Sequence, residues 1–210
     1  MRFQWPLLCC LLLLACKKDP PAEGVKAPAF SPKELSVDGA FHALACGPVT
    51  AIWSGNADAL KDLPQPAPKS FGVESLAFKF ADGSSKGFAP TGQVFFNDWA
   101  FDIFAPDCSM LALQVDHYGP YHLVKAADLR GYLEGKVKPV VVHALNEQTS
   151  MVHSDGRWVT ADAFEFTASC CGGAQVFHAS AKDGPLKKVF DAPAAPKGLK
   201  RVGAGYEVIP

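Results

Sequence analysis

The residues of this chain most able to do chemistry are its seven cysteines. They fall into an N-terminal group and a group in the rest of the chain, namely Cys9, Cys10 and Cys16, then Cys46, Cys108, Cys170 and Cys171. A thiol can form a disulfide, bind a metal ion or carry out redox exchange, and its place in the chain and its spacing from other cysteines favour one of these roles.

An apolar run near the N-terminus accounts for the first group. Arg2 supplies a positive charge, and Leu7 to Ala15 form an apolar stretch that is too short to cross about 30 Å of hydrocarbon as a helix. A charged start followed by such a core is typical of a secretory signal peptide. We therefore expect residues 1–15 to be a signal peptide.

The end of this run resembles the lipobox of bacterial lipoproteins. The residues that carry the resemblance are Leu13-Leu14-Ala15-Cys16. It implies cleavage before Cys16 and acylation of that residue, including palmitate on its thiol, so that Cys16 attaches the protein to a membrane. Lys17 follows where an Asp would favour the inner membrane, which implies an outer-membrane protein facing the periplasm or the cell surface. An ordinary secretory signal is the alternative.

Composition divides the rest of the chain into a tether and a domain. Residues 16–35 are rich in Pro, Ala and charge without any period, which indicates a flexible tether. Residues 36–210 are expected to form a single β-rich domain. The whole chain is 49% hydrophobic, which is enough for a folded core. Its formal net charge of -1 gives no excess of positive charge that would attract nucleic acid.

The expected signal peptide would deliver this domain to an oxidising compartment. An even number of cysteines, here four, favours disulfides in such a compartment. Four cysteines allow three connectivities. A bridge between Cys170 and Cys171 would close a small strained ring, so we expect each of them to pair with Cys46 or Cys108. Free thiols, or a metal site built on Cys170, Cys171 and nearby histidines, are the alternatives, although adjacent cysteines suit a zinc tetrahedron poorly.

Histidines and carboxylates provide only weak candidates for a site. Asp116, His117 and His122 lie closest together, around a Gly-containing turn. Asp98 and Asp102 belong to the same acidic region and could form the carboxylate pair of a glycan hydrolase, which needs no sequence motif. The chain has no nucleotide-binding loop and no His-Glu-x-x-His, so we expect no cofactor and no metal site.

A weak internal repeat predicts the elements that would position these residues. Three Gly-containing turns, at Gly47, Gly119 and Gly172, each lie between two short apolar stretches, which is the signature of a β-hairpin. Further strands are expected at 76–80, 137–145 and 206–209, and short helical turns at 31–35 and 126–133. The aromatic block 92–104 is expected in the core.

The second and third repeats extend backwards through two Asp-centred turns, one at Asp107 and one at Ser154-Asp155-Gly156. These turns resemble those of WD40-like and Tol-B-type β-propeller blades, although Cys108 stands where those families usually have Gly. The resemblance implies an all-β fold of antiparallel sheets, in a small irregular β-propeller-like domain. A β-sandwich is the alternative, because the turns are spaced further apart than the usual 40–50 residues of a blade.

Together these features predict a lipid-anchored cell-envelope protein that is a non-enzymatic binding or assembly module. Its partner would be another envelope protein or a cell-wall polymer, besides the membrane that Cys16 enters. A periplasmic hydrolase acting on a glycan or an ester, and a metal-binding envelope protein, are the two alternatives.

Overall fold

The computed structural model describes residues 31–38, 40–55, 73–88, 102–115, 119–146, 149–170, 173–182, 186–192, 198–202 and 205–209. The expected signal peptide, Cys16 and most of the expected tether lie outside these residues. So do Asp98, Asp116, His117, Cys171 and most of the aromatic block.

The first sheet is a five-stranded antiparallel meander. Its strands follow the order of the chain, and tight turns join β2 to β3 and β4 to β5. Gly47, with a φ of 59°, and Gly83, with a φ of 81°, occupy turn positions that need the left-handed region. The strands are β1 (Lys33–Glu34), β2 (His42–Cys46), β3 (Val49–Gly55), β4 (Val73–Phe80) and β5 (Ser85–Phe88).

The second sheet has three antiparallel strands and carries the helix. A 3₁₀ turn, Ala126–Asp128, leads directly from the second strand into the short helix α1 (Leu129–Leu133). Phe104 adds an isolated bridge to Leu111 on the far side of the first strand. The strands are β6 (Met110–Gln114), β7 (Tyr121–Lys125) and β8 (Val140–Val142).

The third sheet is a four-stranded antiparallel meander that follows a small ribbon, β9 (Leu145–Asn146) with β10 (Thr149–Ser150). Its strands are β11 (Val152–Thr160), β12 (Ala163–Cys170), β13 (Gly173–Ser180) and β14 (Lys187–Ala192). The chain then forms a two-stranded hairpin, β15 (Gly198–Val202) with β16 (Gly205–Ile209), called here the C-terminal hairpin.

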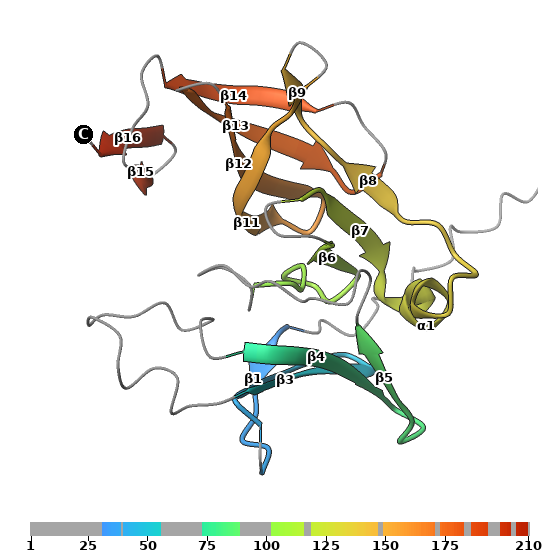
Figure 1. Ribbon diagram of the computed structural model, residues 1–210. Coiled ribbons are helices and arrows are strands. Elements are labelled where there is room, and N and C mark those ends of the chain that lie inside the picture. Colours follow the sequence, from blue (N-terminus) through green and yellow to red (C-terminus); the bar gives the residue numbers. More distant parts are fainter. Residues whose placement is uncertain are drawn as a thin grey trace, which may run out of the picture.

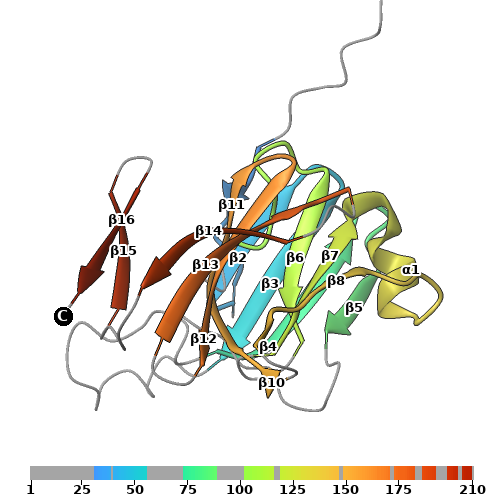
Figure 2. The ribbon, with the colours of Figure 1, turned by 90° about the horizontal axis from the view of Figure 1, so that it is seen from above.

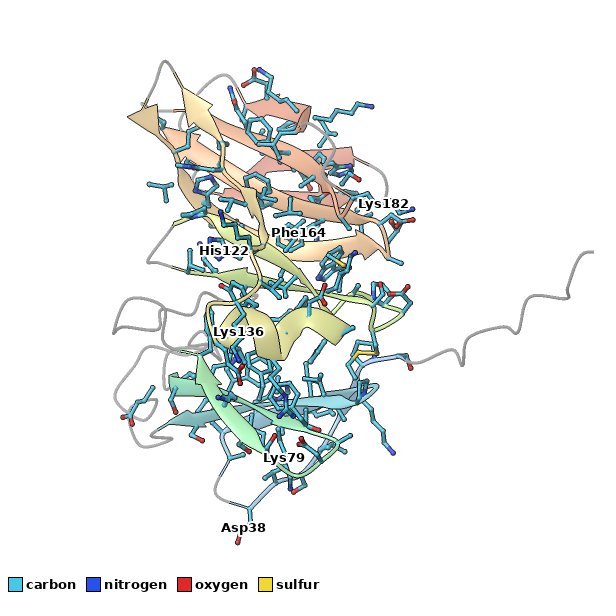
Figure 3. The ribbon with its side chains drawn as sticks, turned by 90° about the vertical axis from the view of Figure 1, so that its right-hand side faces the viewer. Asp38, Lys79, His122, Lys136, Phe164 and Lys182 are labelled. Atoms are coloured by element: carbon cyan, nitrogen blue, oxygen red, sulfur yellow. A yellow bond between two sulfur atoms is a disulfide. The ribbon has the colours of Figure 1, made fainter. Side chains whose placement is uncertain are left out.

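The three sheets stack face to face, with the second in the middle (Figure 1). Leu111 and Leu113 of β6 pack into one core cluster with Trp53 and Phe78 of the first sheet. Side chains of β6 and β7 that alternate with these belong to a second cluster with the third sheet, which includes Ala112, Tyr121, Leu123, Phe164 and Phe166. His122, Phe164 and Lys79 mark the middle, third and first sheets in Figure 3.

The all-β expectation is therefore confirmed, and so are its hairpins. Cys46 pairs with Val49 across the first turn, Gln114 with Tyr121 across the second, and Cys170 with Gly173 across the third. The strands expected within 76–80 and 206–209 and the helical turn at 126–133 are also present. The described sheets form a stack of three layers (Figure 1). The propeller-like arrangement of these sheets stays a prediction.

Two local expectations are wrong. Residues 31–35 form no helical turn, because Lys33 and Glu34 pair with β2 as an edge strand. The turn expected at Ser154-Asp155-Gly156 is instead a register irregularity inside the continuous strand β11. Asp155 takes a left-handed φ of 53° there, and a Cβ on Gly156 would lie 2.5 Å from the Tyr121 ring. The chain thus needs these residues for a bulge and a close approach, and continues in the same sheet.

Candidate functional site

Of the three weak site candidates, the structure describes His122. Its Nδ1 lies 2.8 Å from the hydroxyl of Tyr132, which belongs to α1. Burial lowers the pKa of His122 and raises the pKa of Tyr132 to about 12, so both side chains are neutral at pH 7. The pair therefore joins the helix to the middle sheet through a neutral hydrogen bond.

The described carboxylates of the acidic region are exposed. Asp107 is part of a turn, where its Oδ1 accepts hydrogen bonds from the backbone N and the Oγ of Ser109, at 3.0 and 2.7 Å. The Ser109 hydroxyl lowers the pKa of Asp107 and keeps it ionised. Asp107 thus closes the Asp-centred turn that the sequence predicts before β6.

A disulfide joins Cys46 of β2 to Cys108 in the turn before β6. Their Cα atoms lie 5.2 Å apart, and both residues belong to the core cluster between the first two sheets. The expectation that Cys46 and Cys108 pair with Cys170 and Cys171 is therefore wrong. Stacking of the sheets brings Cys46 and Cys108 together, and no feature of the linear sequence announces that contact.

Cys170 also belongs to a disulfide, whose other cysteine lies outside the described residues. It stands at the end of β12 and packs as a partly buried residue against the second core cluster. Since Cys46 and Cys108 are bonded to each other, they are not its partners.

His153 and Glu165 are the two buried polar side chains among the described residues. His153 is fully buried in β11, where its Nε2 accepts a hydrogen bond of 2.9 Å from the backbone N of Ala144. Its neighbour Ser154 donates its hydroxyl hydrogen to Asp155 and not to His153. The three adjacent residues His153, Ser154 and Asp155 thus form no catalytic relay.

Glu165 lies at the centre of a charged cluster that the sequence analysis missed. The antiparallel register places Arg157 of β11 and His178 of β13 directly beside it, on either side of β12. Successive side chains of a strand point to opposite faces, so these three share the outer face, away from Phe164 and Phe166 in the core. We call Arg157, Glu165, His178 and Tyr206 the Glu165 cluster.

Every oxygen of this carboxylate has donors. Oε1 accepts from Nε and Nη2 of Arg157, at 2.9 and 2.5 Å. Oε2 lies 2.8 Å from Nε2 of His178 and also accepts from the hydroxyl of Tyr206. Because a carboxylate only accepts, the hydrogen of the His178 contact lies on Nε2.

The electrostatics of Glu165 follow from these contacts. Its side chain is 3% exposed. This burial acts to raise its pKa, but hydrogen bonds from Tyr206, Arg157 and His178 outweigh burial, so the pKa lies below its ordinary value. Glu165 is therefore ionised at neutral pH, and its charge is balanced within the protein.

Tyr206 brings the C-terminal hairpin into this cluster. It lies on β16, and its ring centroid is 5.2 Å from that of Phe190 on β14. One side chain thus contacts both the buried carboxylate and an aromatic ring of the third sheet. Figures 1 and 2 show the hairpin beside this sheet and outside the stack.

Sequence reasoning had little chance of finding this cluster. Glu165 reads as an ordinary outward residue in the alternating stretch Phe164-Glu165-Phe166, and its partners lie 8, 13 and 41 positions away in the chain. One available signal was a charged residue flanked by aromatic residues in a strand, because charged groups are rarely buried unless they are paired. Identifying the partners required the strand register.

Comparison with known proteins adds no relative. Scans of family models, of curated proteins and of solved structures returned no match to this chain. Among the described residues, no three His, Cys, Asp or Glu side chains gather closely enough to hold a metal ion. Nor does any helix in the described part have the length and apolarity needed to span a membrane.

Proposed function

We propose that this protein is a lipid-anchored protein of the outer membrane, facing the periplasm or the cell surface, and that it works as a non-enzymatic binding or assembly module. The support for the anchor is the lipobox-like sequence that ends at Cys16. The support for a binding role comes from the folded domain, whose C-terminal hairpin lies outside the three stacked sheets (Figure 2).

The observation that carries the proposal is the pair of exposed valines on this hairpin. Large hydrophobic side chains that are exposed among the described residues are Val141, Val152, Val202 and Val208. Two of these four belong to the C-terminal hairpin, with exposures of 53% for Val202 and 39% for Val208. A short projecting ribbon with exposed valines suits a protein partner better than a sugar polymer, because apolar area drives protein association.

The Glu165 cluster supports a structural role for the one carboxylate that is buried among the described residues. Both carboxylate oxygens accept hydrogen bonds from the chain itself, and Arg157 balances the charge. A general base needs a lone pair directed at its substrate. We therefore assign Glu165 to holding the hairpin, and we propose another envelope protein as the partner that the hairpin contacts.

Replacing Cys16 by alanine tests the anchor. Without the thiol no acyl chains can be attached, and each buried methylene of such a chain contributes about 0.8 kcal/mol to membrane binding. We expect the C16A protein to move from the membrane pellet to the soluble fraction after cell fractionation, and to lose metabolic labelling with palmitate. Retention of label and membrane binding would refute the anchor; the C46A variant, which leaves Cys16 in place, should stay in the pellet.

Replacing the hairpin valines tests the binding role. The double variant V202S/V208S should lose most of the envelope protein that crosslinks to the wild type in intact cells, because it removes exposed apolar area without touching the core. The matched control is V141S/V152S, which removes two exposed valines on other strands and should keep the crosslink.

The readout is the yield of one identified crosslinked partner, quantified by mass spectrometry against the amount of protein captured. Equal yields from the wild type and V202S/V208S would contradict the assignment of the surface. Recovery of cell-wall fragments in place of a protein would replace the proposed partner with a polymer.

A further inference from the structure

Part of the outer face of the third sheet is buried although it points away from both core clusters. Ala174, Val176 and Ala192 are 5%, 2% and 2% exposed, and none of them belongs to either cluster. The register pairs Ala174 with Ala192, and Val176 with Phe190. We call Ala174, Val176, Phe190 and Ala192 the outer apolar patch.

Position in the strand places this patch beside the Glu165 cluster. Ala174, Val176 and His178 alternate along β13 and therefore share one face. His178 contacts Glu165 on that face. The outer face thus has an apolar part next to a buried ionised carboxylate.

Tyr206 links the C-terminal hairpin to both parts. Its ring contacts Phe190 of the outer apolar patch, and its hydroxyl donates to Glu165. Within the part of the chain that the structure describes, β15 and β16 pair with each other and with no strand of the three stacked sheets. The described contacts between the hairpin and the third sheet are therefore made by side chains, and the backbone ladder of the hairpin does not continue that of β14.

We infer that the C-terminal hairpin is a displaceable cover of the outer face of the third sheet, and that the Tyr206 side chain holds it closed. The occupant of the face is thus a segment of this chain. An isolated two-stranded hairpin is marginally stable in water, so the hairpin should lose its own hydrogen bonds when it leaves the sheet. Residues 193–197 join it to β14, which leaves it connected to the sheet in both states.

Most of the Glu165 cluster stays in place when the hairpin opens, so the opening can be reversed. Arg157 and His178 belong to the third sheet itself and stay with Glu165 when Tyr206 leaves. The carboxylate then keeps its counter-charge and loses a single donor, which avoids the large cost of an unpaired buried charge. Segments that lie outside the main sheets can open locally at a fraction of the global unfolding free energy.

This inference goes beyond the proposed function because it concerns the attachment of the hairpin to its own sheet. It needs no partner, and it stands or falls separately from the valine test. If the hairpin both binds a partner and opens, its opening would expose the outer apolar patch while the partner is bound.

Amide hydrogen exchange of the full-length lipidated protein in detergent, read by mass spectrometry, tests the inference. Tyr206→Phe removes the hydroxyl and keeps the ring. Amides of β15 and β16 should exchange about tenfold to hundredfold faster in Y206F than in the wild type, because a hydrogen bond to a charged acceptor is lost. Exchange in β11 to β13 should stay unchanged.

The matched control is Tyr132→Phe, which removes a phenol hydroxyl that pairs with His122 on the other side of the molecule. It should leave exchange in the hairpin unchanged. A second variant, Phe190→Ala, removes the ring that Tyr206 contacts on β14 and should also raise exchange in the hairpin.

Two outcomes would overturn the inference. Unchanged hairpin exchange in both Y206F and F190A would mean that Tyr206 does not hold the hairpin. An equal rise in exchange across β11 to β16 would mean that the hairpin and the sheet open as one unit.

Discussion

Glu165→Ala should lower the free energy of unfolding by about 3 kcal/mol at pH 7. The substitution leaves the Arg157 charge and the His178 ring without the carboxylate that they both contact. Removing one partner of a buried ion pair typically costs 3–5 kcal/mol, and we expect the lower end because the Arg157 side chain is 25% exposed. Urea unfolding followed by tryptophan fluorescence measures the change.

The matched control is Glu207→Ala, which removes an exposed acidic side chain from β16 of the same hairpin. Its effect should stay within about 0.5 kcal/mol. A loss below 1 kcal/mol for E165A, similar to that of E207A, would show that the cluster contributes little to folding.

The Glu165→Gln variant should reveal the pH dependence of this contribution. The folded-state pKa of Glu165 lies below its ordinary value, so its ionised form stabilises the fold above pH 4.5. This stabilisation is lost as the pH falls through the lower folded-state pKa. The difference in stability between the wild type and E165Q should therefore be full at pH 7 and should narrow below pH 4.5.

The second large effect is expected from the disulfide between Cys46 and Cys108. The two residues are separated by 62 positions in the chain, and closing a loop of that length lowers the entropy of the unfolded state. We expect the double variant C46A/C108A to lose about 4 kcal/mol of unfolding free energy, measured in urea under non-reducing conditions. Reduction of the wild type should cause at least this loss, because it also opens the disulfide of Cys170.

A further variant separates the effect of losing the crosslink on stability from the effect of the backbone conformation at Cys108. Cys108 has a φ of 61°, in the left-handed region, which costs a residue with a Cβ about 1–2 kcal/mol. C46A/C108G should therefore be more stable than C46A/C108A by about 1 kcal/mol. Equal stabilities would show that the turn relaxes once the crosslink is gone, and a loss below 1 kcal/mol for C46A/C108A would contradict the loop-closure argument.

The backbone conformation of Cys108 is unusual for a residue with a Cβ. Its φ lies in the left-handed region, which Gly adopts most readily. The disulfide to Cys46 holds Cys108 in place within a core contact. The crosslink therefore supports this turn without a glycine.

The hydrolase and metal-binding alternatives stay predictions. Asp98, Asp116 and His117 lie outside the described residues, and Asp102, the other member of the possible carboxylate pair, is exposed. His122 and Asp107, which lie within the described part, contact Tyr132 and Ser109 respectively.

Local chemistry was enough to predict most of the strands and turns. Gly47 and the turn at Asp82-Gly83 each follow from residues that tolerate a left-handed conformation, and the alternation around Leu76 and Phe78 follows from a strand buried on one face. These features depend on residues within a few positions of one another. The all-β class and the hairpins could therefore be derived from the sequence alone.

Local chemistry failed where a segment had two compatible conformations. Ser154-Asp155-Gly156 contains the residues of a tight turn, yet it forms an irregularity within β11 because Tyr121 and Phe164 pack against Gly156. Lys33 and Glu34 could have ended a helical turn, but the free edge of β2 pairs with them. Packing against distant residues decided both cases.

The sequence by itself was enough to identify the seven cysteines, the lipobox-like end of the apolar run and the positions of the hairpins. Each of these features depends on residue types or on residues that are close together in the chain. The stacking of the sheets decided that Cys46 meets Cys108, and the register across β11, β12 and β13 decided that Arg157 and His178 flank Glu165. Docking of the C-terminal hairpin then added Tyr206 to that carboxylate. Such pairings depend on which strands become neighbours, and that choice is made by the burial of whole sheet faces, which no short stretch of sequence encodes.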